Sequence, residues 1–149
     1  MGSPPVKKAL EMEIPSALGT DGTRVASYNP WIALYWLTSG KTIGGNKVIA
    51  EENILDRATA LRLATHKGYE LIKERDKGRI VKGYFADMVI LSDDYFVIPE
   101  ENIKNIKSKL TIVDGKVVYA SQEYSSVGPK SLPVIPNWSP VKYFGGYQH

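Results

Sequence analysis

The chain has 149 residues, 43% of them hydrophobic, which is enough for one globular domain with a real core. It contains no cysteine, which excludes a disulfide framework, a zinc-thiolate site and a thiol nucleophile, and which fits a cytoplasmic protein. Scattered lysines give the net charge of +3, and the longest apolar run, Trp31 to Leu37, is far below the roughly 20 residues of a membrane span, so neither nucleic-acid binding nor membrane insertion is expected.

A helix and a strand are expected before residue 22. Ser3, followed by two prolines, begins a helix that ends near Met12. The apolar segment Ile14 to Leu18 then favours a short buried strand, which a Gly-Thr-Asp-Gly-Thr loop ends. In an α/β fold this strand would deliver Thr20 and Asp21 to its C-terminal edge, where chemistry is usually placed.

Two helices are expected in the middle of the chain. Asn29 and Pro30 form an N-cap and first-turn pair, and Gly40 stands where a left-handed C-cap belongs. This helix is apolar nearly all round, which predicts that it is buried. Apolar or small residues at spacings of four and three from Ile54 to Ile72 predict a single amphipathic helix, which the segment 76–78 ends.

The second half of the chain is expected to form a small β unit. Strands are predicted at residues 79–81, 88–91, 110–113 and 117–119. Asp114-Gly115 joins the last two, and this dipeptide favours the type I′ turn of a hairpin. Residues 98–103 favour a short helix with a proline in its first turn, with Ile103 and Ile106 facing inward.

The sequence offers few residues for a metal site. Hydrolysis by a bound metal needs about three protein ligands, usually histidines and carboxylates, with one position open for water. The chain has two histidines and neither an HxH nor an HExxH pair. His66 falls within the long predicted helix and His149 ends the chain, so both are interpreted as structural or solvated. Asp93 and Asp94 lack further oxygen ligands at suitable spacing and are interpreted as a solvated turn.

Asp21 is the better candidate for chemistry. Its small neighbours would let the carboxylate approach a ligand or a metal without obstruction. The alternative is a cap within a turn, because Gly-Thr-Asp-Gly-Thr is also a common turn sequence. Arg24 has two interpretations as well, since it could hold a substrate carboxylate or pair with a neighbouring acid.

Several segments carry a family resemblance. They are PPVKKALEM, LGTDGTRVASYNPW, ALYWLTSGKTIGG, LDRATALRLAT, KGRIVKGYFADMVILSDDYFVIPEENI, LTIVDGKVVYA and NWSPVKYFGGY. Taken in this order they resemble the amidohydrolase superfamily, specifically the branch called amidohydrolase family 3, from about Pro4 to Tyr147. The later blocks are similar to the stretch in which such enzymes leave their barrel and enter a β-sandwich.

The resemblance implies a (β/α)8 barrel that binds one or two divalent metals, zinc foremost, through an HxH pair, two later histidines, often a bridging lysine, and an aspartate that ends the eighth strand. It places that aspartate at Asp21, as a metal ligand and as the catalytic group. The implied role is to hold the metal-bound water, accept its proton during attack on an amide or related C–N bond, and pass the proton to the departing amine. Arg24, Tyr28 and Trp31 are expected to form part of the substrate wall.

The chain also departs from the family pattern. It contains one expected barrel strand of eight and lacks the HxH pair and both later histidines, so we expect a C-terminal portion that binds no metal and is inactive alone. Its expected partner is the missing barrel portion, and a small-molecule substrate would bind only once the barrel is complete. A second hypothesis is a non-catalytic module that buries its apolar faces against a second copy of itself. Glu13 replaces the glycine usual in the family, and a left-handed C-cap there costs about 1 kcal/mol.

The expected fold class is α/β, in three parts. Residues 1–76 would be the last strand and helices of a barrel, and residues 77–127 a small β-sandwich-type unit. Residues 128–149, rich in proline and aromatic residues, would form an extended tail docked by its aromatic side chains.

Overall fold

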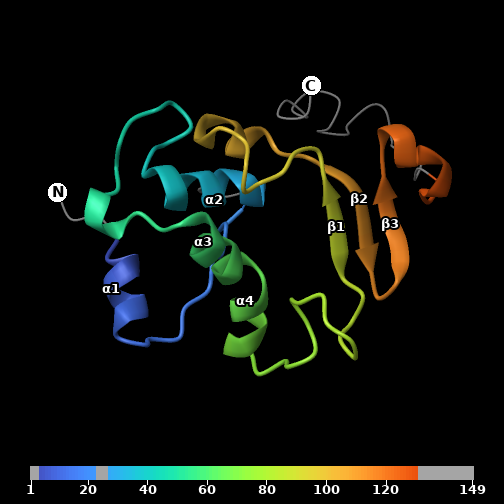
Figure 1. Ribbon diagram of the computed structural model, residues 1–149, viewed down its shortest axis with the longest axis horizontal. Coiled ribbons are helices and arrows are strands. Elements are labelled where there is room, and N and C mark those ends of the chain that lie inside the picture. The colour runs from blue at the N-terminus through green and yellow to red at the C-terminus, as the bar shows by residue number, and fades with distance from the viewer. Residues whose placement is uncertain (1–3, 23–26, 131–149) are drawn as a thin grey trace.

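The computed structural model describes residues 4–22 and 27–130. In chain order its elements are α1 (Val6–Glu11), α2 (Pro30–Ser39), η1 (Glu51–Asn53), α3 (Arg57–Ala64), α4 (His66–Leu71), β1 (Met88–Leu91), η2 (Glu100–Asn105), β2 (Ser108–Val113), β3 (Lys116–Ala120) and η3 (Gln122–Val127). The α-helices gather at one side of the molecule and the three strands at the other (Figure 1). Nearly all of the predicted tail, from residue 131 onward, lies outside the described residues.

Helix α2 forms where its caps predict it. The Asn29 side chain accepts a hydrogen bond from the backbone N–H of Trp31 at 3.0 Å, and this satisfies one of the free N–H groups of the first turn. At the other end Gly40 has a φ of 71° and donates to the Trp36 carbonyl at 3.0 Å. The helix is largely buried, as its apolar circumference predicts.

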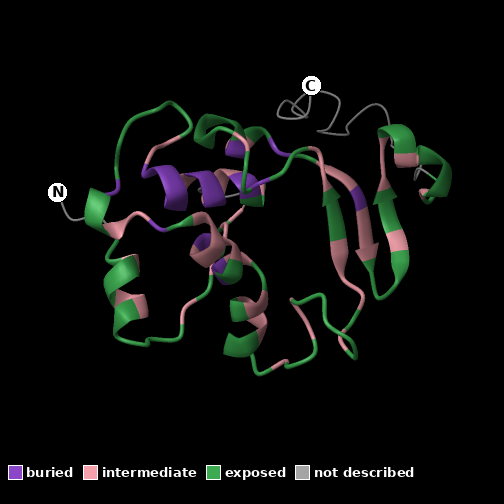
Figure 2. Ribbon diagram, in the orientation of Figure 1, coloured by how far each residue is buried: buried purple, intermediate pink, exposed green. Residues whose placement is uncertain are grey.

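The hydrophobic core lies around α2, where α3 and η2 pack against it (Figure 2). Tyr35 and Ile103, one from each side of the contact between α2 and η2, have no exposed surface. The buried members of this cluster are Trp31, Leu34, Tyr35, Leu37, Leu55, Ala60, Leu63, Tyr95, Ile103 and Ile106. Burial of Ile103 and Ile106 confirms the inward face predicted for the short helix, which is a 3-10 helix.

Arg57 ties α3 to the segment that leads from the sheet into η2. Its guanidinium donates to the carbonyl oxygens of Tyr95 at 2.6 Å and Ile98 at 2.7 Å. The Tyr95 hydroxyl donates back to the Arg57 carbonyl at 3.1 Å. Because the guanidinium presents its N–H groups in a planar fork, one side chain serves two carbonyls of the same segment.

The β unit is a three-stranded antiparallel sheet in the order β1-β2-β3. Asp114 and Gly115 have φ values of 50° and 73°, the pair of positive angles that the predicted type I′ turn requires. The three strands confirm the predictions at 88–91, 110–113 and 117–119. Of the strand residues only Leu110 is buried, so the sheet is peripheral to the core.

Two predicted strands are wrong. Residues 14–18 and 79–81 form no strand, and Ile14 and Ile80 are 48% and 82% exposed. A strand is stable only when a neighbour fills its backbone hydrogen bonds. Here the Leu18 N–H instead donates to the carbonyl of Leu63 in α3 at 2.9 Å. The backbone at the end of the first segment is therefore bonded to a helix and not to a neighbouring strand.

The long helix predicted from Ile54 to Ile72 is also wrong, because α3 and α4 are separate helices. They are divided at Thr65, whose φ of −118° and ψ of −107° are not helical. The Thr65 hydroxyl donates to the Leu61 carbonyl at 2.8 Å, a local bond that competes with helix continuation. The helical region ends at Leu71, before the predicted stop at 76–78.

The end of α1 adopts the geometry that the sequence predicts at some cost. Glu13 has a φ of 55°, and the Ile14 N–H donates to the Ala9 carbonyl at 3.0 Å. This is the left-handed C-terminal motif that glycine usually occupies.

Among the helices of residues 4–22 and 27–130, none is long and apolar enough to cross a bilayer.

Candidate functional site

Asp21 lies in the connection between α1 and α2, outside any strand. It is exposed and has a φ of 48°, a left-handed conformation that aspartate tolerates better than most residues. No hydrogen bond or ion pair joins its carboxylate to another described residue. Within the described part of the chain the carboxylate is therefore open to a proton donor or a ligand, although not from the strand edge that the sequence predicted.

The neighbouring Gly22 brings this connection back on itself. A Cβ on Gly22 would lie 2.9 Å from the Cα and 3.2 Å from the Cβ of Tyr28, so the two backbones are in direct contact. Asp21 thus stands one residue from the contact with Tyr28. Arg24, the third predicted site residue of this loop, lies among residues 23–26 and outside the described residues.

Tyr28 and Trp31, at and after the contact with Gly22, differ in their exposure. Tyr28 is 56% exposed, whereas Trp31 is 8% exposed and packs its ring 5.8 Å from that of Tyr95. The Ser27 hydroxyl accepts from the Asn29 N–H at 3.1 Å, which fixes the turn into α2. The structure therefore brings three of the four predicted residues to one segment, with Tyr28 at the surface and Trp31 partly in the core.

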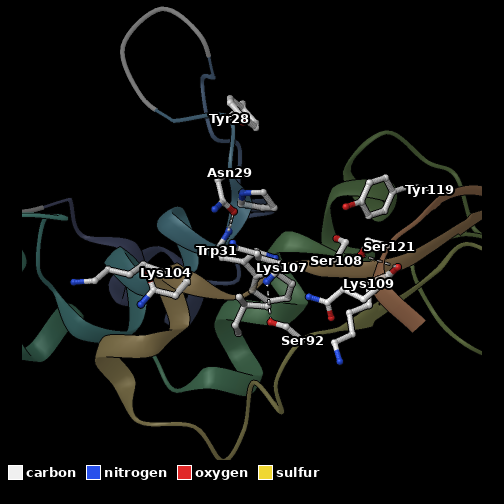
Figure 3. A pocket seen from close by; sticks show the side chains of 14 residues that line it. Tyr28, Asn29, Trp31, Ser92, Lys104, Lys107, Ser108, Lys109, Tyr119 and Ser121 are labelled. Carbon is white, nitrogen blue, oxygen red and sulfur yellow. Dashed lines mark hydrogen bonds between the residues drawn. The ribbon is translucent and has the colours of Figure 1, made fainter. Parts of the chain in front are cut away.

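A pocket of about 390 Å³ opens beside this segment. The predicted residues Tyr28 and Trp31 line it, and Figure 3 shows Tyr28 and Tyr119 on different sides of it. We call it the basic pocket and define it by its lining: Tyr28, Asn29, Pro30, Trp31, Ser92, Lys104, Asn105, Ile106, Lys107, Ser108, Lys109, Tyr119, Ser121 and Gln122. Three of these residues are lysines, and none is Asp or Glu.

Sequence reasoning missed these lysines. They fall within six residues, at 104, 107 and 109, and that spacing was a usable signal for a local positive charge. Two are paired with acids outside the lining. Lys104 lies 3.3 Å from Glu101, and Lys109 lies 2.8 Å from Glu123. The hydrogen bond to Glu123 raises the pKa of Lys109 above its ordinary value and lowers that of Glu123.

Glu101 anchors η2, and with it the wall of the pocket, to α2. Its carboxylate accepts hydrogen bonds from Lys41 at 2.5 Å and from the buried Tyr35 hydroxyl at 2.7 Å. The Lys41 bond is the main cause that lowers the pKa of Glu101 to about 2, and the bonds from Tyr35 and Lys104 lower it further. The charged form of Glu101 is therefore part of the packing of α2 against η2.

The remaining polar candidates show no catalytic arrangement. His66 starts α4, and its side chain lies 3.9 Å from Glu70. Burial is the main cause that lowers its pKa, with Arg79 adding to the effect. Asp94 accepts from the Phe96 N–H at 2.8 Å, and Asp93 accepts from the Ser92 hydroxyl at 2.7 Å, contacts typical of a turn. His149 lies outside the described residues.

A metal-ligand cluster is not formed by the described residues. No group of three or more His, Asp or Glu side chains within residues 4–22 and 27–130 could hold a metal ion. A catalytic zinc takes about three protein ligands. Asp21 can supply one carboxylate, so the donor set in this part of the chain does not fit a catalytic metal by itself.

Comparison with known proteins gives a consistent result. The family model described as "Amidohydrolase family" matches residues 1–119. The chain is also 34% identical over 70 residues to the Bacillus subtilis (strain 168) protein named "Putative amidohydrolase YtcJ". That alignment covers 46% of this chain and 13% of the Bacillus protein. No solved structure matches the chain.

Proposed function

The chain belongs to the amidohydrolase family, and from this we propose that it is the C-terminal portion of a hydrolase that cleaves C–N bonds other than peptide bonds, in amides or cyclic amides. The observation that carries the proposal is the carboxylate of Asp21. It is exposed, held at a φ of 48° and unpaired among the described residues, one residue from the Gly22–Tyr28 contact.

The chemistry assigned to Asp21 is proton transfer. A water molecule attacks the carbonyl carbon, and its oxygen forms the new bond to that carbon while the Asp21 carboxylate accepts the released proton. The carboxyl group then donates this proton to the nitrogen as the C–N bond breaks. Amide and water thereby become carboxylic acid and amine, and Asp21 returns to its ionised form.

Three features of the loop support this role. The Asp21 carboxylate forms no ion pair with another described residue. The small residues on either side of Asp21 leave the approach open. The exposed Tyr28, at the contact with Gly22, and Trp31 would provide aromatic surface for a substrate. Arg24, on the same loop, would provide a cation for it.

We further propose that this portion works only when joined to the rest of a barrel. The family is generally metal-dependent, and the described residues do not fit a metal site alone. In this proposal residues 1–76 are the end of the barrel and residues 77–127 part of its β-sandwich. The barrel portion supplies the remaining ligands, for zinc foremost, and the isolated chain hydrolyses nothing.

The test is complementation. The chain is co-expressed with a barrel portion that carries the HxH pair and later histidines, and amine release is measured on a panel of N-acyl amines and cyclic amides. Activity is expected only from the combination. Asp21→Asn, which tolerates the same backbone conformation, is expected to abolish it while the two portions still associate. Glu52→Gln, which removes an exposed carboxylate elsewhere, is the matched control.

Two results would contradict the proposal. Full activity of an assembled Asp21→Asn combination would remove Asp21 from the chemistry. Hydrolysis by the isolated chain that persists with a metal chelator present, and that the barrel portion does not change, would contradict the need for a partner.

A further inference from the structure

We propose that the basic pocket binds a small organic anion with a planar apolar body, such as an aromatic carboxylate. This inference does not rest on hydrolysis, because the described lining of the pocket comes entirely from residues 28–122 of this chain. It rests on the charge of the lining, on its aromatic surfaces and on the rigidity of its walls.

The charge of the lining favours an anion. The described lining of the pocket contains three lysines and no acidic residue. Lys104 and Lys109 form ion pairs with Glu101 and Glu123, which are not lining residues. The ammonium group of Lys107 forms no hydrogen bond or ion pair with another described residue, and Lys107 is exposed. Among the described lining residues it is therefore the cation with free capacity for a ligand, and the positive end of α2, which lines the same pocket, adds to the attraction.

The apolar surfaces favour a ligand with a flat body rather than a bare inorganic ion. Trp31 and Ile106 are buried residues of the lining. The half-exposed Tyr28 and Tyr119 stand on different sides of the pocket (Figure 3). Aromatic side chains pack well against flat apolar rings. The volume of about 390 Å³ exceeds the roughly 150 Å³ cavity that takes benzene, so the pocket has enough volume for a ring with a carboxylate.

The walls are fixed on both sides of the lysine segment. Ser92 and Lys107 exchange two hydrogen bonds: the Ser92 N–H donates to the Lys107 carbonyl at 2.8 Å, and the Lys107 N–H donates to the Ser92 hydroxyl at 3.0 Å. The Ser121 N–H donates to the Lys109 carbonyl at 2.9 Å. A pocket with fixed walls loses little conformational freedom when a ligand enters, and this favours binding.

The hydroxyl and amide groups of the lining give the anion further donors. Ser108, Asn105 and Gln122 are lining residues that can donate hydrogen bonds to carboxylate oxygens. Hydrogen bonds to a charged acceptor are stronger than those between neutral groups. A carboxylate is therefore preferred over a neutral amide of the same shape.

The test uses the whole 149-residue chain and three probes. Benzoate is titrated while the Trp31 indole and Lys107 signals are followed by NMR, and benzamide and acetate are titrated in the same way. Benzoate is expected to saturate these signals and to bind at least about fivefold more tightly than benzamide, which has the same shape without the charge, and than acetate, which has the charge without the ring.

A pair of lysine variants completes the test. Lys107→Gln is expected to weaken benzoate binding by roughly two- to fivefold, as loss of one exposed ionic contact does. Lys8→Gln removes an exposed lysine of α1 and is expected to leave binding unchanged. Absence of a saturable shift at Trp31, equal binding of benzamide, or equal loss in the two variants would each overturn the proposal. The hydrolase proposal is untouched by any of these results, because no reaction is measured.

Discussion

Gly78 is packed so closely against the start of α4 that replacing it by alanine is expected to lower the free energy of unfolding. An added Cβ would lie 2.5 Å from the Cα and 2.9 Å from the N of His66, and 2.8 Å from Cδ2 of Tyr69. Two of these three atoms are backbone, so a side-chain rotation cannot relieve the contact. Gly78 also has a φ of 77°, which alanine adopts only with strain.

The two effects add. The left-handed conformation costs alanine about 1 kcal/mol, and moving a packed backbone to admit a methyl group costs about 1–3 kcal/mol more. Gly78→Ala is therefore expected to lower the free energy of unfolding by about 2–4 kcal/mol. Small domains have about 5–15 kcal/mol in total, so the loss would be readily measured by urea denaturation followed by circular dichroism.

Gly115→Ala is the matched control for this prediction. Gly115 has a φ of 73°, nearly the same angle, but a Cβ there would meet no atom within 4 Å. It is expected to show only the conformational cost of about 1 kcal/mol. Equal destabilisation by the two variants would refute the argument from the close contact, and a harmless Gly78→Ala would refute both parts of it.

Three further predictions concern stability and its dependence on pH. Glu13→Gly should stabilise the chain by about 0.5–1 kcal/mol in urea denaturation, because Glu13 holds a φ of 55°; no gain would mean that the turn tolerates a Cβ. The pKa of Glu101 is lowered from 4.5 to about 2, so the stability that its carboxylate contributes is present above pH 4.5 and is lost as the pH falls towards 2. The difference in Tm between the wild type and Glu101→Gln should therefore shrink across that window. A constant difference would contradict this. Burial raises the pKa of Tyr95 from 10.0 to about 12, so its contribution holds below pH 10 and is lost as the pH rises towards 12. Tyr95→Phe should lose about 1 kcal/mol at neutral pH with the bond to Arg57 and should remove the phenolate absorbance step near pH 12; a late step that persists in Tyr95→Phe would contradict the assignment.

Features set by neighbours in the chain were predictable from the sequence. The Asn29-Pro30 cap, the Gly40 stop and the Asp114-Gly115 turn each depend on the conformation of a few adjacent residues, and all three are present. The left-handed conformation of Glu13 follows from the same local logic. The family resemblance, which rests on longer segments, is confirmed by the match over residues 1–119.

Features set by distant partners were not predictable. Apolar residues 14–18 and 79–81 have the composition of strands, but a strand needs a neighbour, and sequence patterns do not show whether one is there. The break at Thr65 is a local exception, because the apolar spacing from Ile54 to Ile72 continues across it and so did not show it. The basic pocket unites residues 28–31 with residues 104–122, so its lysines had no visible connection to Tyr28 and Trp31 in the sequence.

The double hydrogen bond from Arg57 to the carbonyls of Tyr95 and Ile98 limits how this chain can change over evolutionary time. Arginine-to-lysine exchange needs a single nucleotide change from some codons and is usually treated as neutral drift. At position 57 it would keep the positive charge but lose the planar fork that reaches both carbonyls. One carbonyl would be left without its donor, and the exchange would be selected against as if it changed the chemical class of the residue.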